Sequence, residues 1–155
     1  MVARVSNPPM FKAIAVGGLV AGTLDITQAI ILFGWRVPFS IAAGLIGKEA
    51  AHNGGPAIYA LGLLLHYFIA TSAAAIYYGA SRRLPFLREY ALVCGLFFGM
   101  AVDLTMTLVV LPLSALHDTG PYTWSDLVLG LVVHMIVVGL PIAYSVKRFS
   151  SARVT

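Results

Sequence analysis

Charged residues are scarce in this chain of 155 residues. Only 10% of the residues are Asp, Glu, Lys or Arg, and 59% are hydrophobic, whereas a soluble domain usually has about 25% charged residues. Such a composition excludes a soluble globular domain, which needs polar surface on all sides. The net charge is +4, but the basic residues form short clusters between apolar runs. That pattern is typical of membrane topology and not of nucleic-acid binding.

Cysteine and the common catalytic motifs are also scarce. Cys94 is the only cysteine, so no internal disulfide can form. The sequence contains no phosphate-binding loop, no G-x-S-x-G and no H-E-x-x-H, and no nucleophile stands beside a base. These absences argue against an enzyme of the soluble type.

Long apolar runs, in contrast, occur four times. A hydrocarbon core of about 30 Å needs roughly 20 helical residues, and we predict spans near 13–34, 57–79, 90–113 and 125–146. Backbone groups in lipid must be paired within their own segment, so the spans should be helices. We therefore expect one all-α transmembrane domain over residues 1–155, embedded in a lipid bilayer.

The distribution of Lys and Arg predicts an orientation. The basic residues on the side of the termini are Arg4, Lys12, Arg82, Arg83, Arg88, Lys147, Arg148 and Arg153. The opposite side holds only Arg36 and Lys48. Because positive residues concentrate in cytoplasmic segments, we expect a multi-pass protein of a bacterial inner membrane with both termini in the cytoplasm.

The first outer connection, residues 35–56, is longer than a turn requires. Its segment Pro38–Ala51 predicts either a helix lying in the membrane interface or a segment that dips towards the bundle, and we favour the interfacial helix. Trp35, Tyr122 and Trp124 are typical of aromatic anchors at the interface.

Two pairs of segments indicate an internal duplication. LGLLLHYFIA from Leu61 resembles LGLVVHMIVV from Leu129, and GLVAGTLDIT from Gly18 resembles GLFFGMAVDLT from Gly95. Each half, 13–79 and 90–146, would be one helical hairpin. Because a hairpin has an even number of spans, the halves should be parallel repeats that form a pseudo-twofold four-helix bundle.

The duplicated segments carry four ionisable residues at one predicted depth, namely Asp25, His66, Asp103 and His134. At 1.5 Å per residue, all four lie roughly 18 to 20 Å from the inner end of their spans. Ionisable residues at the centre of a membrane usually mark a functional site. We predict a midplane polar cluster, with supporting side chains at Gln28, Thr107, Tyr77 and Tyr144.

We predict that this cluster binds a cation, either a proton or a divalent metal ion, in a role that includes transport. For a metal such as Zn²⁺ or Fe²⁺, the ligands would be Asp25, His66, Asp103 and His134. Alternating access in so small a chain would call for a homodimer. A b-type haem between the two histidines, as in an electron-transfer protein, ranks lower, with Gly62 and Gly130 leaving room for the ring.

Two alternatives involve no ligand. In the first, the Asp–His pairs serve only to lock the bundle together, as buried polar residues fix register in coiled coils. The chain would then be an accessory or assembly subunit of a larger membrane complex. Its GxxxG faces, Gly18–Gly22 and Gly95–Gly99, would bind other membrane helices.

The stretches VVLPLSA (Val109–Ala115) and HMIVVGLPIA (His134–Ala143), with AGTLD near Ala21, resemble a widespread group of small bacterial four-span inner-membrane proteins of unknown function. The resemblance extends from about Gly17 to Arg148. It implies the four-span architecture and no particular activity. Pro112 and Pro141 stand in these stretches, and we expect them to kink the third and fourth spans.

Overall fold

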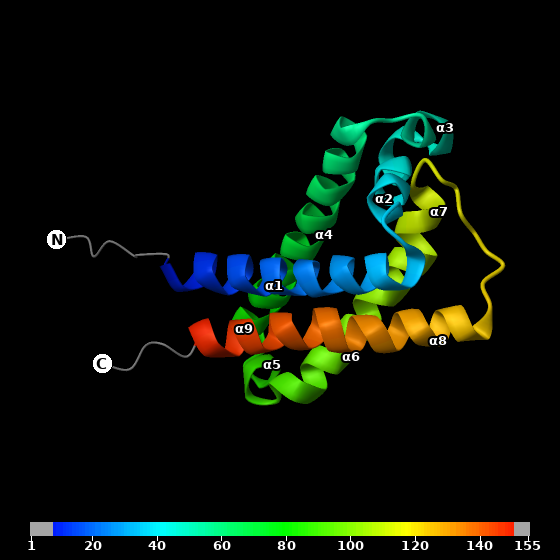
Figure 1. Ribbon diagram of the computed structural model, residues 1–155. Helices are drawn as coiled ribbons and strands as arrows, with labels where there is room; N and C mark the ends of the chain where they lie inside the picture. Colours follow the sequence, from blue (N-terminus) through cyan, green and yellow to red (C-terminus); the bar gives the residue numbers. More distant parts are fainter. Residues whose placement is uncertain (1–7, 151–155) are drawn as a thin grey trace.

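The computed structural model describes residues 8–150, which are largely helical and contain no strand (Figure 1). Four segments are long and apolar enough to cross a membrane: Met10–Phe33, Pro56–Arg83, Ala91–Leu113 and Trp124–Ser150. Each boundary lies within four residues of its prediction. The all-helical architecture with four candidate spans is thus confirmed, and it indicates a membrane protein. The predicted basic residues Arg4 and Arg153 lie outside the described residues.

The first two spans are unbroken helices, α1 (Pro8–Phe33) and α4 (Pro56–Arg83). The third consists of α6 (Ala91–Thr105), the π-helical turn η1 (Met106–Val110) and α7 (Leu111–Leu113). The fourth consists of α8 (Trp124–Val133), the π-helical turn η2 (His134–Gly139) and α9 (Leu140–Ser150). A short helix, α5 (Phe86–Glu89), joins the two halves.

Each π-helical turn ends two residues before a proline, Pro112 or Pro141. Proline has no backbone N–H, and its ring clashes with the carbonyl four residues earlier, so a regular α-helical turn cannot continue there. A wider turn relieves the clash. The two prolines therefore interrupt the regular α-helix of their spans through π-helical turns.

The long outer connection forms two helices, α2 (Val37–Ile46) and α3 (Lys48–His52), separated by Gly47 with φ at +84°. The helix α2 packs against α4 so closely that a side chain at Gly62 would collide with the backbone carbonyl of Pro38. Ala42 and Ala43 of α2 are buried. The packing favours the alternative that we ranked second, a segment that dips towards the bundle, over a helix confined to the interface.

Small residues allow the spans to approach one another. A side chain at Gly18 would meet Thr71 of α4 at 2.6 Å, and one at Gly99 would meet the backbone of Met135 at 2.6 Å. Gly22 and Gly95 are in similar contacts inside the chain. Both GxxxG faces are thus occupied by the protein's own helices, and they give no support to the accessory-subunit hypothesis.

The first helix of each half, α1 and α6, makes different contacts with its neighbours. The helix α1 packs on both α4 and α9, whereas α6 packs mainly on η2 and α9 and meets α4 chiefly where the Phe98 ring contacts Tyr77. A twofold axis would make the α1–α9 contact equivalent to one between α6 and α4. Instead, an apolar groove of about 280 Å³ lies between α4 and the third span. The packing therefore departs from exact twofold symmetry.

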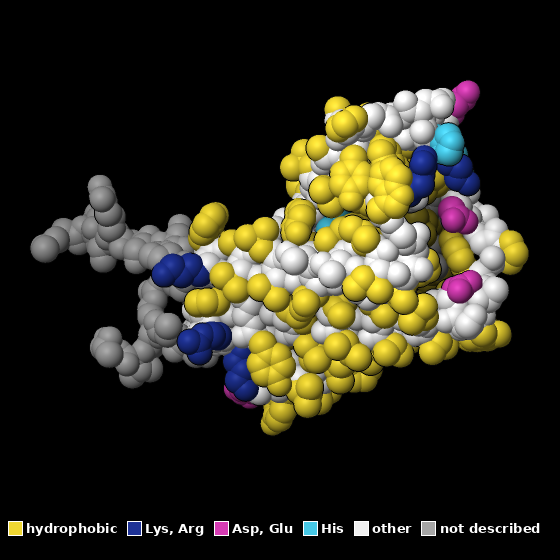
Figure 2. All heavy atoms as spheres, in the orientation of Figure 1, with side chains coloured by type: hydrophobic (Ala, Val, Ile, Leu, Met, Phe, Trp, Pro, Cys, Tyr) yellow, Lys and Arg dark blue, Asp and Glu magenta, His cyan; other side chains and the backbone are white. Residues whose placement is uncertain are grey.

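The two ends of the bundle differ in charge and in packing. Lys and Arg side chains gather where α1 begins and α9 ends, and the surface between the ends is mostly hydrophobic (Figure 2). Near the basic end, the core is sealed by fully buried side chains, among them Tyr77, Ile142 and Val146. The polar residues at midspan are thus closed off from this end by packed apolar groups.

Candidate functional site

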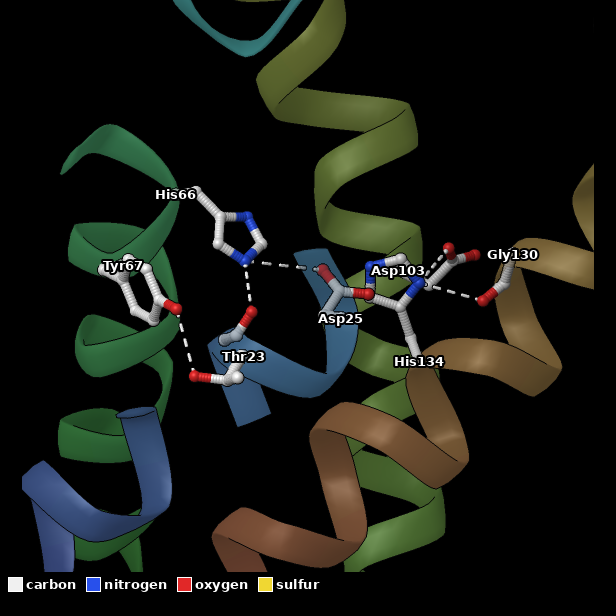
Figure 3. A network of polar contacts seen from close by, with 8 residues as sticks. Thr23, Asp25, His66, Tyr67, Asp103, Gly130 and His134 are labelled. Atoms are coloured by element: carbon white, nitrogen blue, oxygen red, sulfur yellow. Dashed lines mark hydrogen bonds and ion pairs between the residues drawn. The ribbon is translucent and has the colours of Figure 1, made fainter. Parts of the chain in front are cut away.

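The first Asp–His pair joins α1 to α4. The Nε2 atom of His66 lies 2.8 Å from the carbonyl oxygen of Gly22 and 4.0 Å from Oδ2 of Asp25 (Figure 3). Because a carbonyl only accepts hydrogen bonds, Nε2 must carry a hydrogen and donate it. The longer separation from Asp25 is an electrostatic contact and not a hydrogen bond.

The second pair joins α6 to the start of η2. The Nδ1 atom of His134 lies 3.1 Å from Oδ1 of Asp103 and 2.9 Å from the carbonyl oxygen of Gly130 (Figure 3). Here Nδ1 carries the hydrogen and donates it to the Gly130 carbonyl, and the Asp103 carboxylate is an electrostatic neighbour. The Asp103 residue is buried, with 7% of its surface exposed. The second pair is therefore the tighter and the better enclosed.

Each histidine has a second ring nitrogen, Nδ1 in His66 and Nε2 in His134. Neither makes a hydrogen bond with any residue between 8 and 150. In a neutral imidazole whose other nitrogen holds the hydrogen, this second nitrogen bears a free lone pair. Both rings can thus accept a proton or coordinate a ligand without losing the contacts that orient them.

A cavity of about 90 Å³ connects the two pairs. Its walls include Asp25, His66 and His134, together with apolar side chains from α2, α4 and the third span. The Asp103 side chain does not line it. At about 30 Å³ per water molecule, the cavity has room for roughly three waters.

A ready-made metal centre is not present among residues 8–150, because no three His, Cys, Asp or Glu side chains come together in a group that could hold one ion. The four predicted ligands remain two separate pairs. The space expected for a haem ring is also filled. The backbone of Pro38 packs on Gly62, and a side chain at Gly130 would lie 2.9 Å from the Asp103 carboxylate. The room that the haem interpretation requires is therefore taken up by the protein.

The four supporting residues lie apart from the pairs. The Tyr77 hydroxyl donates a hydrogen bond to the carbonyl of Leu87, near the basic end, and Tyr144 is 48% exposed on α9. Gln28 and Thr107 are half-buried and make no hydrogen bond to the cluster. None of these four side chains joins the cluster in this structure.

Two residues next to the first pair, Thr23 and Tyr67, were not among the predicted site residues. The hydroxyl groups of Thr23 and Tyr67 lie 3.0 Å apart, and the Tyr67 ring packs edge-on against His66 with centroids 5.6 Å apart. Their only signal in the sequence is proximity to Asp25 and His66.

The outer connection contains a further pattern that was not predicted as a site. Glu49 and His52 have the E-x-x-H spacing of some metal ligands.

Comparison with known proteins adds no functional information. No family model, curated protein or solved structure matches the chain. The resemblance to small four-span membrane proteins thus stays a prediction.

Proposed function

We propose that this chain is a small membrane protein whose Asp25/His66/Asp103/His134 cluster takes up and releases protons at the centre of the bilayer. The observation that carries the proposal is the arrangement of the two imidazoles. One nitrogen of each is fixed by a backbone carbonyl beside a carboxylate, and the other has no partner among the described residues. Histidine in such a setting is a common proton carrier.

The geometry favours a proton over a metal ion. A divalent metal needs three or four ligands around one point, whereas the described side chains contribute no such set. A proton needs only one lone pair and a neighbour to receive it. The cavity lined by Asp25, His66 and His134 brings two imidazole rings and a carboxylate to a space of the size of a few waters.

We further infer that both termini lie in the cytoplasm of a bacterium, with the bundle in the inner membrane. Of the described basic residues, the end of the bundle where α1 begins, α4 ends and α9 ends holds Lys12, Arg82, Arg83, Arg88, Lys147 and Arg148. The other end holds Arg36 and Lys48, beside acidic residues at Glu49, Asp118 and Asp126. This asymmetry follows the positive-inside rule.

Reporter fusions in a bacterial host test the orientation. We expect a fluorescent protein fused after Thr155 to fluoresce and alkaline phosphatase at the same position to stay inactive, because phosphatase folds only outside the cytoplasm. The control is phosphatase fused after Asp118, in the loop that joins the third and fourth spans, which should be active. The opposite pattern at the two positions would reverse the topology.

The duplication also belongs to this proposal. Each Asp–His pair lies inside one predicted hairpin, Asp25 with His66 and Asp103 with His134. Two copies of an ancestral hairpin, each with one pair, account for this pattern. The π-helical turns and unequal contacts would then be later departures in the second copy.

The proton proposal is tested by flux into vesicles that contain the purified protein, a trapped pH-sensitive dye and an imposed membrane potential. We expect the Asp25→Asn substitution to slow proton flux at least about a hundredfold, the low end of what one positioned proton-transfer group contributes. Asparagine keeps the shape of the side chain but cannot carry a proton. The matched control is Asp126→Asn in the first turn of α8, which should conduct like the wild type.

Wild-type flux in Asp25→Asn would contradict the relay. So would a wild-type protein that conducts no better than empty vesicles. In either case the pairs would be structural, as the alternative hypothesis holds. Thermal unfolding of each variant in detergent separates loss of conduction from loss of fold.

A further inference from the structure

A second, larger cavity lies at the end of the bundle opposite the basic end. Its volume is about 650 Å³, and it is formed by α2, α3 and the residues around them. Its polar lining residues are Arg36, Ser40, Lys48, Glu49, His52 and Asn53. We call it the outer pocket. It shares no lining residue with the cavity of about 90 Å³ between the Asp–His pairs, which we call the midplane cavity. Binding in the outer pocket therefore does not depend on proton uptake at the cluster.

Both cations at this end of the described chain line the outer pocket. Arg36 and Lys48 are the only Lys or Arg residues here, and both belong to its walls. Basic residues are disfavoured on the outer side of a membrane protein. Their convergence on one pocket therefore indicates a ligand of opposite charge.

The Arg36 guanidinium group is held in place within the pocket. Its Nη2 atom lies 3.4 Å from Nδ1 of His52, and its central carbon lies over the rings of Trp35 and Phe39, at 5.6 and 5.5 Å from their centroids. These contacts occupy the faces of the group but leave N–H donors unused, because a guanidinium has five. No carboxylate neutralises its charge within residues 8–150.

The rest of the lining has hydrogen-bond donors to spare. Lys48 forms no ion pair within the described part of the chain, and the side chains of Ser40 and Asn53 form no hydrogen bonds there. Glu49 is the single carboxylate in the lining, against two permanent cations. A metal ion held by Glu49 and His52 would face repulsion from both cations, so the chemistry selects an oxyanion.

The aromatic residues beside the pocket indicate its level in the membrane. Phe39 packs edge-on against Trp35 and Tyr59, with ring centroids 5.9 and 5.4 Å apart. Trp and Tyr concentrate at the level of the lipid headgroups. Arg36 also follows the end of the first span by three residues. Lipid phosphates lie at this level, and Arg binds phosphate through paired N–H groups.

We propose that the outer pocket binds the phosphate group of a membrane phospholipid between Arg36 and Lys48. The lipid is thereby anchored against α2, the helix whose Ile41 also borders the midplane cavity.

The test measures lipid retention by native mass spectrometry of the detergent-purified protein, titrated with phosphatidylglycerol or with a neutral glycolipid of the same acyl chains. We expect the wild type to retain phosphatidylglycerol more tightly than the glycolipid. The Arg36→Gln/Lys48→Gln variant should bind phosphatidylglycerol roughly 25-fold more weakly, about fivefold for each charge near a membrane surface. The matched control, Arg82→Gln/Arg83→Gln at the opposite end, should bind it like the wild type.

Lys48→Gln alone is the second variant, because Lys48 has no described partner whose loss would disturb the fold, and it should weaken binding about fivefold. Equal binding of phosphatidylglycerol by the wild type and the pocket variants would overturn the proposal. Equal retention of the two lipids by the wild type would do the same. A third titration uses inorganic phosphate. If phosphate binds and needs Arg36, while the lipid does not bind, the lipid proposal is overturned and the pocket binds a soluble oxyanion.

Discussion

The Gly139→Val substitution will lower the free energy of unfolding by about 3 kcal/mol, at the upper end of the usual cost of overpacking. A side chain at this position would collide with the backbone carbonyl of Gly95 and would lie 2.8 Å from the backbone nitrogen of Gly99. Backbone atoms cannot rotate away as a flexible side chain can. The contact between α6 and the fourth span would have to open.

The control for this prediction is Gly79→Val in α4, where an added side chain meets nothing within 4 Å. It should change the free energy of unfolding by no more than about 0.5 kcal/mol, as surface substitutions usually do. Both variants are compared by thermal and denaturant unfolding in the same detergent. Equal losses in the two variants would show that α6 and η2 do not approach as closely as the structure indicates.

The His134→Ala substitution will cost about 3 kcal/mol, the upper end of the range for leaving a buried polar group without its partner. The described structure gives the Asp103 carboxylate His134 as its only ion-pair or hydrogen-bond partner. Removal of His134 leaves this buried group alone. The His66→Ala substitution should cost only about 1 kcal/mol, because Asp25 is 4.0 Å away and its side chain is twice as exposed, 18% against 9%.

A second substitution distinguishes this cause from simple loss of packing. If an orphaned carboxylate is responsible, Asp103→Ala should recover about half or more of the loss in the His134→Ala background. Asp103→Ala alone should be milder than His134→Ala, because His134 keeps its hydrogen bond to the Gly130 carbonyl. Unfolding measurements on the two single variants and the double variant form the required cycle. Additive losses would contradict the explanation.

The four-helix architecture was predictable because it depends on length and hydrophobicity alone. A run of about 20 apolar residues has few alternatives in a membrane. The proximity of Asp25 to His66, and of Asp103 to His134, was also within reach, since the rise per residue sets the depth along each span. The hydrogen bonds to Gly22 and Gly130 were not predictable, because they depend on how the helices cross and on side-chain rotamers.

The two tyrosines illustrate the limits of helical periodicity. Tyr77 is eleven residues after His66, which returns it to nearly the same face but moves it about 16 Å along the axis. Its hydroxyl therefore reaches Leu87 instead of the cluster. Tyr144 is ten residues after His134, and the π-helical turn η2 lies between them. This turn rotates Tyr144 around the helix axis relative to the position that a regular α-helix would give it. A prediction that assumes 3.6 residues per turn throughout the span cannot include that turn.

The π-helical turns also determine where a span can lose one residue without a change in the direction of its side chains. A residue of regular α-helix advances the facing by about 100°, so loss of one residue from the unbroken helix α1 would turn every later side chain of that span. A π-helical turn holds one residue more than an α-helical turn. Loss of one residue within Met106–Val110 or His134–Gly139 would close the wide turn and leave the flanking segments facing as before, at the cost of restoring the clash with the proline ring. The third and fourth spans thus each contain a place where a one-residue deletion preserves the orientation of both halves.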